Sequence, residues 1–407
     1  MSAAPPPARS PLREPIFRDL WLANLVSNLG TWMQNIGGVW LMTNLSSDAL
    51  PVALMQTATT LPAFIAGLPA GSLADRVDRR KLLLLTQLWM LFIAAILTVL
   101  TALGFMSPWI LLVFTFGLGL GSAMSQPSWS AILPDVVSRA QVPNAIIANS
   151  AGYNVARAGG PALGGVVVAV FGAATAFGIN AASFGATVWV VARWKPRETR
   201  SERSGERFLR TMWTGIEYGF REKTQRVVLG RSSIWMLCAS ALWGLLPLVA
   251  RRELGLDAPG YGLLVTCVGA GAVAGSVILP RLRRRWGTNR LLLAAIVTFA
   301  CMLLVLAWVH VLPLVYVMLA LGGAAWTSSN QNFQIAVQMS APSWVRARAI
   351  AAYFLTFQGG QAIGSAIWGS AADHVGDSIA LTGAAVGLFV GLVAAVRWPV
   401  EDAPIDR

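Results

Sequence analysis

Charged residues are scarce in this sequence. Aspartate, glutamate, lysine and arginine make up 12% of the 407 residues, whereas a soluble domain is about one quarter charged. Hydrophobic residues make up 56% of the chain. This imbalance excludes an ordinary soluble domain and predicts a chain that lies mostly within a membrane.

Cysteine and histidine are also rare, which limits the chemistry that the chain can carry. Cys238, Cys267 and Cys301 fall in different apolar runs with no CxxC or Cys/His spacing, so the sequence predicts neither disulfides nor a zinc site. It contains no GxSxG, HExxH or Walker A motif, and no GxGxxG in a βαβ context. We therefore expect no enzyme activity, no cofactor and no ATP-driven pumping by this chain alone.

Long apolar runs are abundant. Twelve of them reach about 18 residues or more, the length that crosses a bilayer. We expect spans at residues 20–42, 50–74, 82–104, 108–133, 143–170, 173–194, 226–250, 259–280, 289–309, 313–338, 347–371 and 377–397. The Pro-rich start of the chain has no apolar core, so it predicts a short tail rather than a signal peptide.

The basic residues lie almost entirely on one side of these spans. Of 31 lysines and arginines, 28 fall in the loops and tails of one side, Arg251 and Arg252 fall on the other, and Arg157 lies inside a span. This asymmetry is typical of the positive-inside pattern, so we expect both termini in the cytoplasm. Arginine outnumbers lysine 28 to 3, which indicates a bacterial genome and hence a multi-pass protein of the inner (plasma) membrane. The basic residues behind the net charge of +13 then determine how the chain is oriented in the membrane, and we expect no nucleic-acid partner.

The chain repeats itself at an offset of 204 residues, although chance alignment of small residues is an alternative. The aligned pairs are Gly67/Gly271, Gly71/Gly275, Gly160/Gly364, Gly165/Gly369 and Gly172/Gly376, with basic triplets at 79–81 and 283–285. The repeat predicts two six-helix bundles, at residues 19–194 and 226–398, between tails at 1–18 and 399–407. Residues 195–225 form the linker, either as an amphipathic helix on the cytoplasmic membrane surface or as a flexible segment.

Two motifs carry a family resemblance. GSLADRVDRRK, residues 71–81, resembles the G-x-L-A-D-R-x-G-R-R-K signature of the major facilitator superfamily, with Asp78 in place of the usual glycine. GPALGG, residues 160–165, resembles the GPxxGG motif of the antiporters of that superfamily. FRDLWLANLVSNLGTWM, NVARAGGPALGG and the Arg346–Arg348 pair are similar to the branch that contains the bacterial enterobactin exporter, a group of transmembrane secretion effectors.

The resemblance implies an all-α membrane protein in which twelve transmembrane helices form two pseudo-symmetric bundles, the major facilitator fold. It implies a secondary transporter that exports a small amphipathic molecule, siderophore-like or drug-like, by alternating access. Proton antiport is implied by the resemblance alone. We expect a monomer in the lipid bilayer with a small-molecule substrate. A membrane sensor or assembly partner that keeps the fold without transport is the alternative.

The first motif predicts a latch at the cytoplasmic side. Asp75 ends an apolar run, where an unpaired carboxylate is costly, and a cation or a helix N-terminus would relieve that cost. The resemblance implies that Asp75 holds the two halves together while the cavity faces outward; a topological anchor without a gating role is the alternative. The expected latch residues are Gly71, Asp75, Arg76, Arg79 and Arg80.

The second motif predicts a bend in the fifth span. Pro161 removes a backbone hydrogen bond and can bend the helix. The resemblance implies that this bend helps to seal the periplasmic side. The expected bend residues are Gly160, Pro161, Gly164 and Gly165.

Amides and aromatics recur at helical spacing within the expected spans, where polar side chains face a cavity or a neighbouring helix. The expected cavity residues are Asn28, Trp32, Gln56, Gln126, Asn154, Arg157, Asn180, Gln331, Gln334, Gln358 and Gln361. For each amide, an interhelical hydrogen bond is an equal alternative. Arg157 is the one charge expected deep in a span, and no acid is expected there to neutralise it.

A cavity with a fixed cation and no carboxylate favours neutral or anionic, oxygen-rich ligands over cations. Hydrogen bonds from Arg157 to backbone carbonyls are the alternative. The same absence of acids leaves proton coupling without an evident carrier within the membrane.

Overall fold

The computed structural model describes residues 10–194, 222–342 and 345–397, and helices account for nearly all of them. The helices are α1 (Pro15–Leu45), α2 (Ala49–Arg76), α3 (Arg79–Ala102), α4 (Pro108–Val136), α5 (Val142–Phe171), α6 (Ala173–Arg193), α8 (Lys223–Leu248), α9 (Ala258–Trp286), α10 (Thr288–Trp308), α11 (Leu312–Ser340), α12 (Arg346–Val375) and α13 (Asp377–Arg397). Short 3-10 turns occur at Pro11–Arg13 and Arg139–Gln141, and a π turn at Val249–Glu253 follows α8. The linker helix expected within 195–225 and most of both tails lie outside the described residues.

Nine helices of the described chain are long and apolar enough to cross a membrane. They are α2 to α6 and α8 to α11, whereas α13 contains a shorter apolar stretch. α1 and α12 carry amides such as Asn28 and Gln358 in their central turns, which lowers their mean hydropathy. The expected all-α membrane fold is confirmed, and the count of twelve spans stays a prediction.

Capping residues and glycines set where several of these helices begin and end. The Asp78 carboxylate caps α3 by accepting hydrogen bonds from the backbone N–H groups of Arg80 at 2.9 Å and Lys81 at 3.1 Å. The aspartate that replaces the usual glycine of the motif is therefore a helix N-cap. Gly172 and Gly376, one offset of 204 apart, end α5 and α12 with φ angles of 81° and 86°, a conformation that glycine adopts without a steric penalty.

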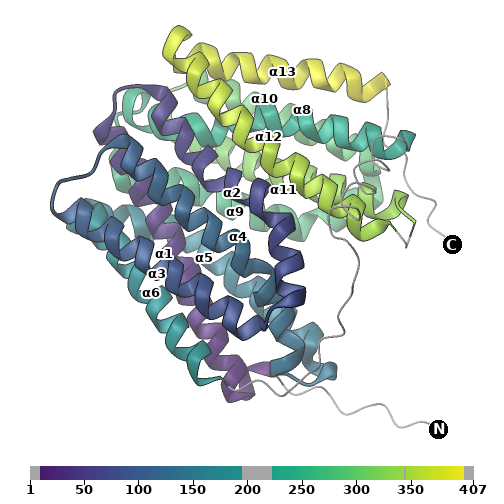
Figure 1. The fold of residues 1–407 in the computed structure, drawn as a ribbon. Helices are drawn as coiled ribbons and strands as arrows, with labels where there is room; N and C mark the ends of the chain where they lie inside the picture. Colours follow the sequence, from purple (N-terminus) through teal and green to yellow (C-terminus); the bar gives the residue numbers. More distant parts are fainter. Residues whose placement is uncertain (1–9, 195–221, 343–344, 398–407) are drawn as a thin grey trace.

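The helices pack into two bundles with the same internal pattern (Figure 1). In the first bundle α1 packs on α5 and α6, α2 on α4, and α3 on α4 and α6. In the second bundle α8 packs on α12 and α13, α9 on α11, and α10 on α11 and α13. Each pair in the second bundle corresponds to a pair in the first, so the structure supports the internal repeat.

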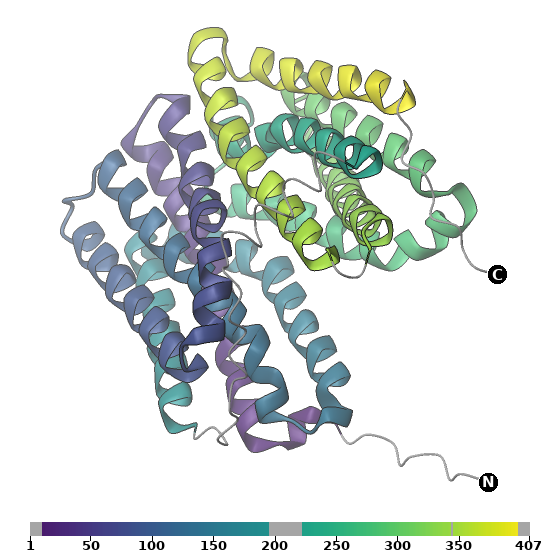
Figure 2. The same ribbon diagram turned by 45° about the vertical axis from the view of Figure 1, so that its right-hand side comes forward.

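Two helix pairs make most of the contact between the bundles, α2 with α12 and α5 with α9 (Figure 2). The first helix of each bundle starts, and the last helix ends, at one end of the molecule, which we call the terminal end. The loops α1–α2, α3–α4, α5–α6, α8–α9, α10–α11 and α12–α13 lie at the opposite end, which we call the distal end.

Candidate functional site

The bundles touch mainly through the distal halves of their helices. The Thr57 hydroxyl of α2 donates a hydrogen bond to the Ala362 carbonyl of α12 at 2.7 Å. On the other pair the backbones approach closely, because a Cβ added to Gly262 of α9 would lie 2.5 Å from the Pro161 carbonyl oxygen of α5. A Cβ added to Gly165 of α5 would lie 2.6 Å from the Ala258 carbonyl oxygen of α9. These contacts close the space between the bundles at the distal end.

Arg251 and Arg252 reinforce this closure, although the sequence singled them out only as exceptions to the charge asymmetry. The Arg251 guanidinium donates hydrogen bonds to Thr43 and Asn44 of the first bundle and lies 5.9 Å from the ring centroid of Trp40. The Arg252 guanidinium donates to the Ser47 carbonyl of the first bundle and to the Asp377 carboxylate of its own bundle. Both arginines therefore fasten the second bundle to the α1–α2 loop region.

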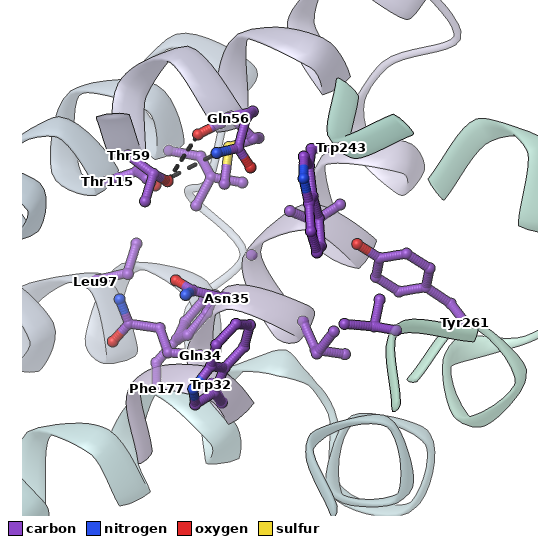
Figure 3. Close-up of a pocket in the computed structure, with 16 residues that line it drawn as sticks. Trp32, Gln34, Asn35, Gln56, Thr59, Leu97, Thr115, Phe177, Trp243 and Tyr261 are labelled. Atoms are coloured by element: carbon purple, nitrogen blue, oxygen red, sulfur yellow. Dashed lines mark hydrogen bonds between the residues drawn. The ribbon is translucent and has the colours of Figure 1, made fainter. Parts of the chain in front are cut away.

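A stacked pair of aromatic rings lies next to the Arg251 guanidinium. The Trp40 and Tyr261 rings, one from each bundle, stack with centroids 6.1 Å apart. Tyr261 also lines the innermost end of the cavity, together with Trp32, Gln34, Asn35, Gln56 and Trp243 (Figure 3).

From this inner end a cavity extends between the bundles toward the terminal end. Its inner end encloses about 80 Å³, a central recess about 420 Å³ and an outer chamber about 990 Å³. The three share lining residues such as Asn35 and Thr59, so they lie next to one another. Helices of both bundles line it.

The structure brings most of the sequence-predicted cavity residues together. Asn28, Gln126, Asn180 and Gln358 line the outer chamber; Trp32 and Gln56 line the recess and the inner end; and Arg157, Gln331, Gln334 and Gln361 line the recess. Asn154 is exposed on α5 and lines none of the three. Tyr153 and Arg157, four residues apart on α5, line the recess, and the expected role of Asn154 stays a prediction.

Two of these amides have structural partners. The Asn180 amide of α6 is buried and donates a hydrogen bond to the Gln34 amide oxygen of α1 at 2.6 Å. The Asn28 amide donates to the Asn24 carbonyl in its own helix at 2.8 Å. At Asn180 the interhelical alternative is thus realised at the cavity wall.

Arg157 is a half-buried cation in the recess. Its guanidinium has no hydrogen bond or ion pair with any residue that the structure describes. Aspartate and glutamate are absent from the described lining of all three parts of the cavity. The recess therefore presents a positive charge whose hydrogen-bond donors face the open space or water.

Sequence reasoning missed the aromatic wall of the recess. Trp326 of α11 lies with its ring centroid 5.7 Å from that of Trp243 and 6.0 Å from that of Phe357. Tyr353 packs against Phe357 and donates its hydroxyl hydrogen to the Asn330 carbonyl at 3.1 Å. A signal was present, because Trp326, Asn330 and Gln334 recur every four residues on one face of α11.

The latch motif lies at the terminal end. The surroundings of Gly71 and the side chains of Asp75 and Arg76 are outside the described part, so their expected role stays a prediction. Arg79 forms a 3.3 Å ion pair with Asp135 of α4, and Arg80 donates hydrogen bonds to the carbonyls of Val191 and Ala192 of α6. These contacts of Arg79 and Arg80 lie within the first bundle.

The expected bend motif lies at close helix crossings. A Cβ on Gly160 would lie 2.5 Å from the Trp32 Cβ atom, and one on Gly164 would lie 2.8 Å from the Met33 Cα atom. Gly160 and Gly164 therefore seat α5 on α1, while Pro161 and Gly165 face α9 across the bundle boundary.

Comparisons with known proteins agree with this architecture. The transmembrane secretion effector family matches residues 7–405. The multidrug efflux pump Tap of Mycobacterium tuberculosis (strain H37Rv) is 24% identical over 98% of both chains. The staphyloferrin A transporter of Staphylococcus aureus is 25% identical over 64% of this chain, and the match spans just under two thirds of that transporter, 65%.

Solved structures share the fold. The nucleoside transporter NupG superposes with a TM-score of 0.77 at 12% identity, covering 94% of this chain and 98% of that one. A bacterial homologue of the lysosomal transporter Spinster, solved in an inward-facing and unoccupied conformation, gives 0.73 at 14% identity over 95% and 97% of the two chains. The expected major facilitator fold is confirmed.

Proposed function

The chain belongs to the transmembrane secretion effector family of major facilitator transporters, and we propose that it exports a small amphipathic molecule, siderophore-like or drug-like, by alternating access. The relatives named above, a siderophore transporter and a multidrug efflux pump, support these two substrate classes. We place the protein in the bacterial inner membrane as a monomer, with both termini in the cytoplasm.

The cavity between the bundles carries this proposal. It is closed by interbundle contacts at the distal end and extends toward the terminal end, as an inward-facing exporter requires for loading from the cytoplasm. Its recess of about 420 Å³ falls in the size range of drug-binding pockets. Amides, tryptophans and tyrosines line it together, a combination that suits amphipathic molecules.

Arg157 gives the cavity its proposed selectivity. A guanidinium whose donors face the cavity can bind a carboxylate or another oxygen-rich group with two parallel hydrogen bonds. A cationic ligand would meet the same charge without a compensating acid in the described lining. We therefore propose neutral or anionic substrates that contact Arg157 with their polar part and the Trp243–Trp326 wall with their apolar part.

The remaining elements complete the transport cycle. We propose that Asp75 and its neighbouring basic residues latch the terminal end when the cavity faces outward, and that the linker at 195–225 lies on the cytoplasmic membrane surface. Proton antiport is the proposed coupling.

Uptake into inverted membrane vesicles tests the function, because export fills such vesicles. Staphyloferrin A and a macrolide antibiotic serve as probes, with vesicles lacking the protein as the control. We expect at least one probe to accumulate, and an acidic vesicle interior to increase the rate if protons are exchanged for substrate. Specific binding of the probes without accumulation would overturn transport and favour the sensor alternative.

A further inference from the structure

The first turn of α2 lies at the boundary between the two bundles, and its backbone N–H groups need partners from outside the helix. Ala49 and Leu50 are the first two residues of α2, and Pro51 has no N–H. The N–H of Asp48, which precedes the helix, donates to the Ser46 hydroxyl at 3.1 Å. Two donors in this turn are thus left for an external acceptor, the N–H groups of Ala49 and Leu50.

Asp373 of the second bundle takes both donors. Its two carboxylate oxygens accept from the Ala49 N–H at 2.5 Å and from the Leu50 N–H at 3.0 Å. α12 runs antiparallel to α2, so the last turn of α12 brings this carboxylate to the positive N-terminus of α2. Asp373 therefore caps a helix of the other bundle.

The residue that would ordinarily cap α2 is not engaged. Asp48 occupies the N-cap position with φ −80° and ψ 146°, the extended geometry typical of a capping aspartate, yet its side chain makes no cap hydrogen bond. It is exposed and accepts only a long 3.5 Å contact from the Ser47 hydroxyl. An unused cap therefore lies next to the one that is in use.

We propose that the cap of α2 is exchanged during transport: Asp373 alone provides it when the distal end is closed, and Asp48 provides it only when the bundles separate there. The inference rests on the proposed alternating access. Separation of α2 from α12 would otherwise leave the Ala49 and Leu50 donors without a protein acceptor. With the exchange, the helix is capped in both states, and the free-energy difference between them stays small.

The exchange assigns opposite effects to two aspartates. Asp373 is a positioning residue that stabilises the distally closed state, and Asp48 stabilises the distally open state. Loss of an N-cap acceptor changes a population ratio by about fivefold to thirtyfold, the equivalent of about 1–2 kcal/mol. Asp373→Ala should raise the open-to-closed ratio by this factor. Asp48→Ala should lower the ratio, most visibly when it is added to Asp373→Ala.

Spin-label distances across the distal end test the exchange in the full-length protein without substrate. Labels are placed on cysteines that replace Phe105 and Val311, which are exposed in distal loops of the first and second bundle, after the three native cysteines have been changed to serine. We expect a longer-distance population that grows from wild type through Asp373→Asn to Asp373→Ala, because asparagine keeps one acceptor oxygen. Asp48→Ala in the Asp373→Ala background should reduce it again.

Two results would overturn the inference. An unchanged distance distribution in both Asp373→Asn and Asp373→Ala would remove Asp373 from the distal closure. A double variant as open as Asp373→Ala alone would show that Asp48 caps nothing. If Asp373→Ala fails to fold, Asp373→Asn alone and combined with Asp48→Ala give the same comparison. Because the distances are measured without transport, failure of the vesicle assay leaves this inference standing, and the reverse also holds.

Discussion

Arg252 and Asp377 form an ion pair in which both carboxylate oxygens accept from Nη1, at 3.1 Å and 3.0 Å. Asp377 is 5% exposed, so its charge depends on this partner, whereas Arg252 is partly exposed and also reaches the Ser47 carbonyl across the bundle boundary. Arg252 thus neutralises the buried Asp377 carboxylate and also connects the two bundles.

Arg252→Ala should lower the melting temperature of the purified protein. It leaves the Asp377 carboxylate buried and unpaired, at a cost of about 1–3 kcal/mol once the exposure of Arg252 is taken into account. Arg252→Ala combined with Asp377→Asn should melt higher than Arg252→Ala alone, because a neutral amide is cheaper to bury. If the double variant is no more stable than Arg252→Ala, the ion pair is not the source of the effect.

Asn180→Ala should lower the thermal stability of the protein more than its affinity for ligand. The substitution removes the donor to the buried Gln34 oxygen, and an unsatisfied buried acceptor costs about 1–3 kcal/mol. Thermal unfolding and ligand titration of the purified protein separate the two effects. Asn28→Ala is the matched control, because the Asn28 amide bonds within its own helix and should cost less. Equal losses at both positions would contradict this assignment.

Asp75 and Asp78 should respond differently to substitution. Asp78→Asn should be mild because asparagine caps a helix about as well as aspartate, whereas Asp78→Ala should cost about 1 kcal/mol. Asp75→Asn should slow turnover more than it weakens substrate binding, since the proposed latch acts on the conformational step. Transport rates and binding affinities of the three variants provide the comparison. If the Asp75→Asn protein transports at the wild-type rate, Asp75 is a topological anchor without a gating role.

Topology follows from the distribution of basic residues. We expect cytoplasmic termini because 28 of 31 lysines and arginines fall in the loops and tails that the sequence places on one side of the membrane. A reporter enzyme that is active only in the periplasm, fused after Arg407, should give no signal. The same reporter inserted after Gly104, in the α3–α4 loop at the distal end, is the positive control. A strong signal from the C-terminal fusion would reverse the orientation.

The helices were predictable because apolar runs bounded by charges and glycines determine them locally. The run at 289–309 matches α10 at Thr288–Trp308, and Asp78 and Gly172 mark helix ends in the sequence itself. Most of the amides expected in the cavity also line it in the structure, since an amide in an apolar run needs a polar environment, and their contact with substrate stays a prediction.

Contacts between distant segments were not predictable. The Asp373–Ala49 contact joins residues 324 positions apart and depends on how the bundles pack. In the sequence, Trp243 and Trp326 cannot be distinguished from buried core residues. Only the packing of α8, α11 and α12 places them on a cavity wall. The surroundings of Asn154 were not predictable for a similar reason, because spacing defines a helix face but not which neighbour covers it.

Arg157 provides the sharpest test of substrate recognition. If its guanidinium binds an oxygen-rich ligand in a bidentate manner, Arg157→Lys should preserve the fold and lose affinity, because an ammonium group cannot reproduce the two parallel hydrogen bonds. Loss of one charge-assisted hydrogen bond costs about 1.5–3 kcal/mol, or about ten- to a hundredfold in affinity. Arg157→Gln should lose more, and anionic ligands should be affected more than neutral ones.

The measurement is binding of an anionic and a neutral probe to purified variants, with melting temperature recorded beside it. Gln331→Glu is the matched control in the same recess, because it places an acid among the residues that line the Arg157 side of the cavity. It should weaken the anionic probe and spare the neutral one while the guanidinium stays in place. Arg157→Lys and Arg157→Gln proteins that fold normally and bind both probes like the wild type would make Arg157 a packing residue, because a cation that recognises the ligand cannot be replaced by an amide without a loss of anion affinity.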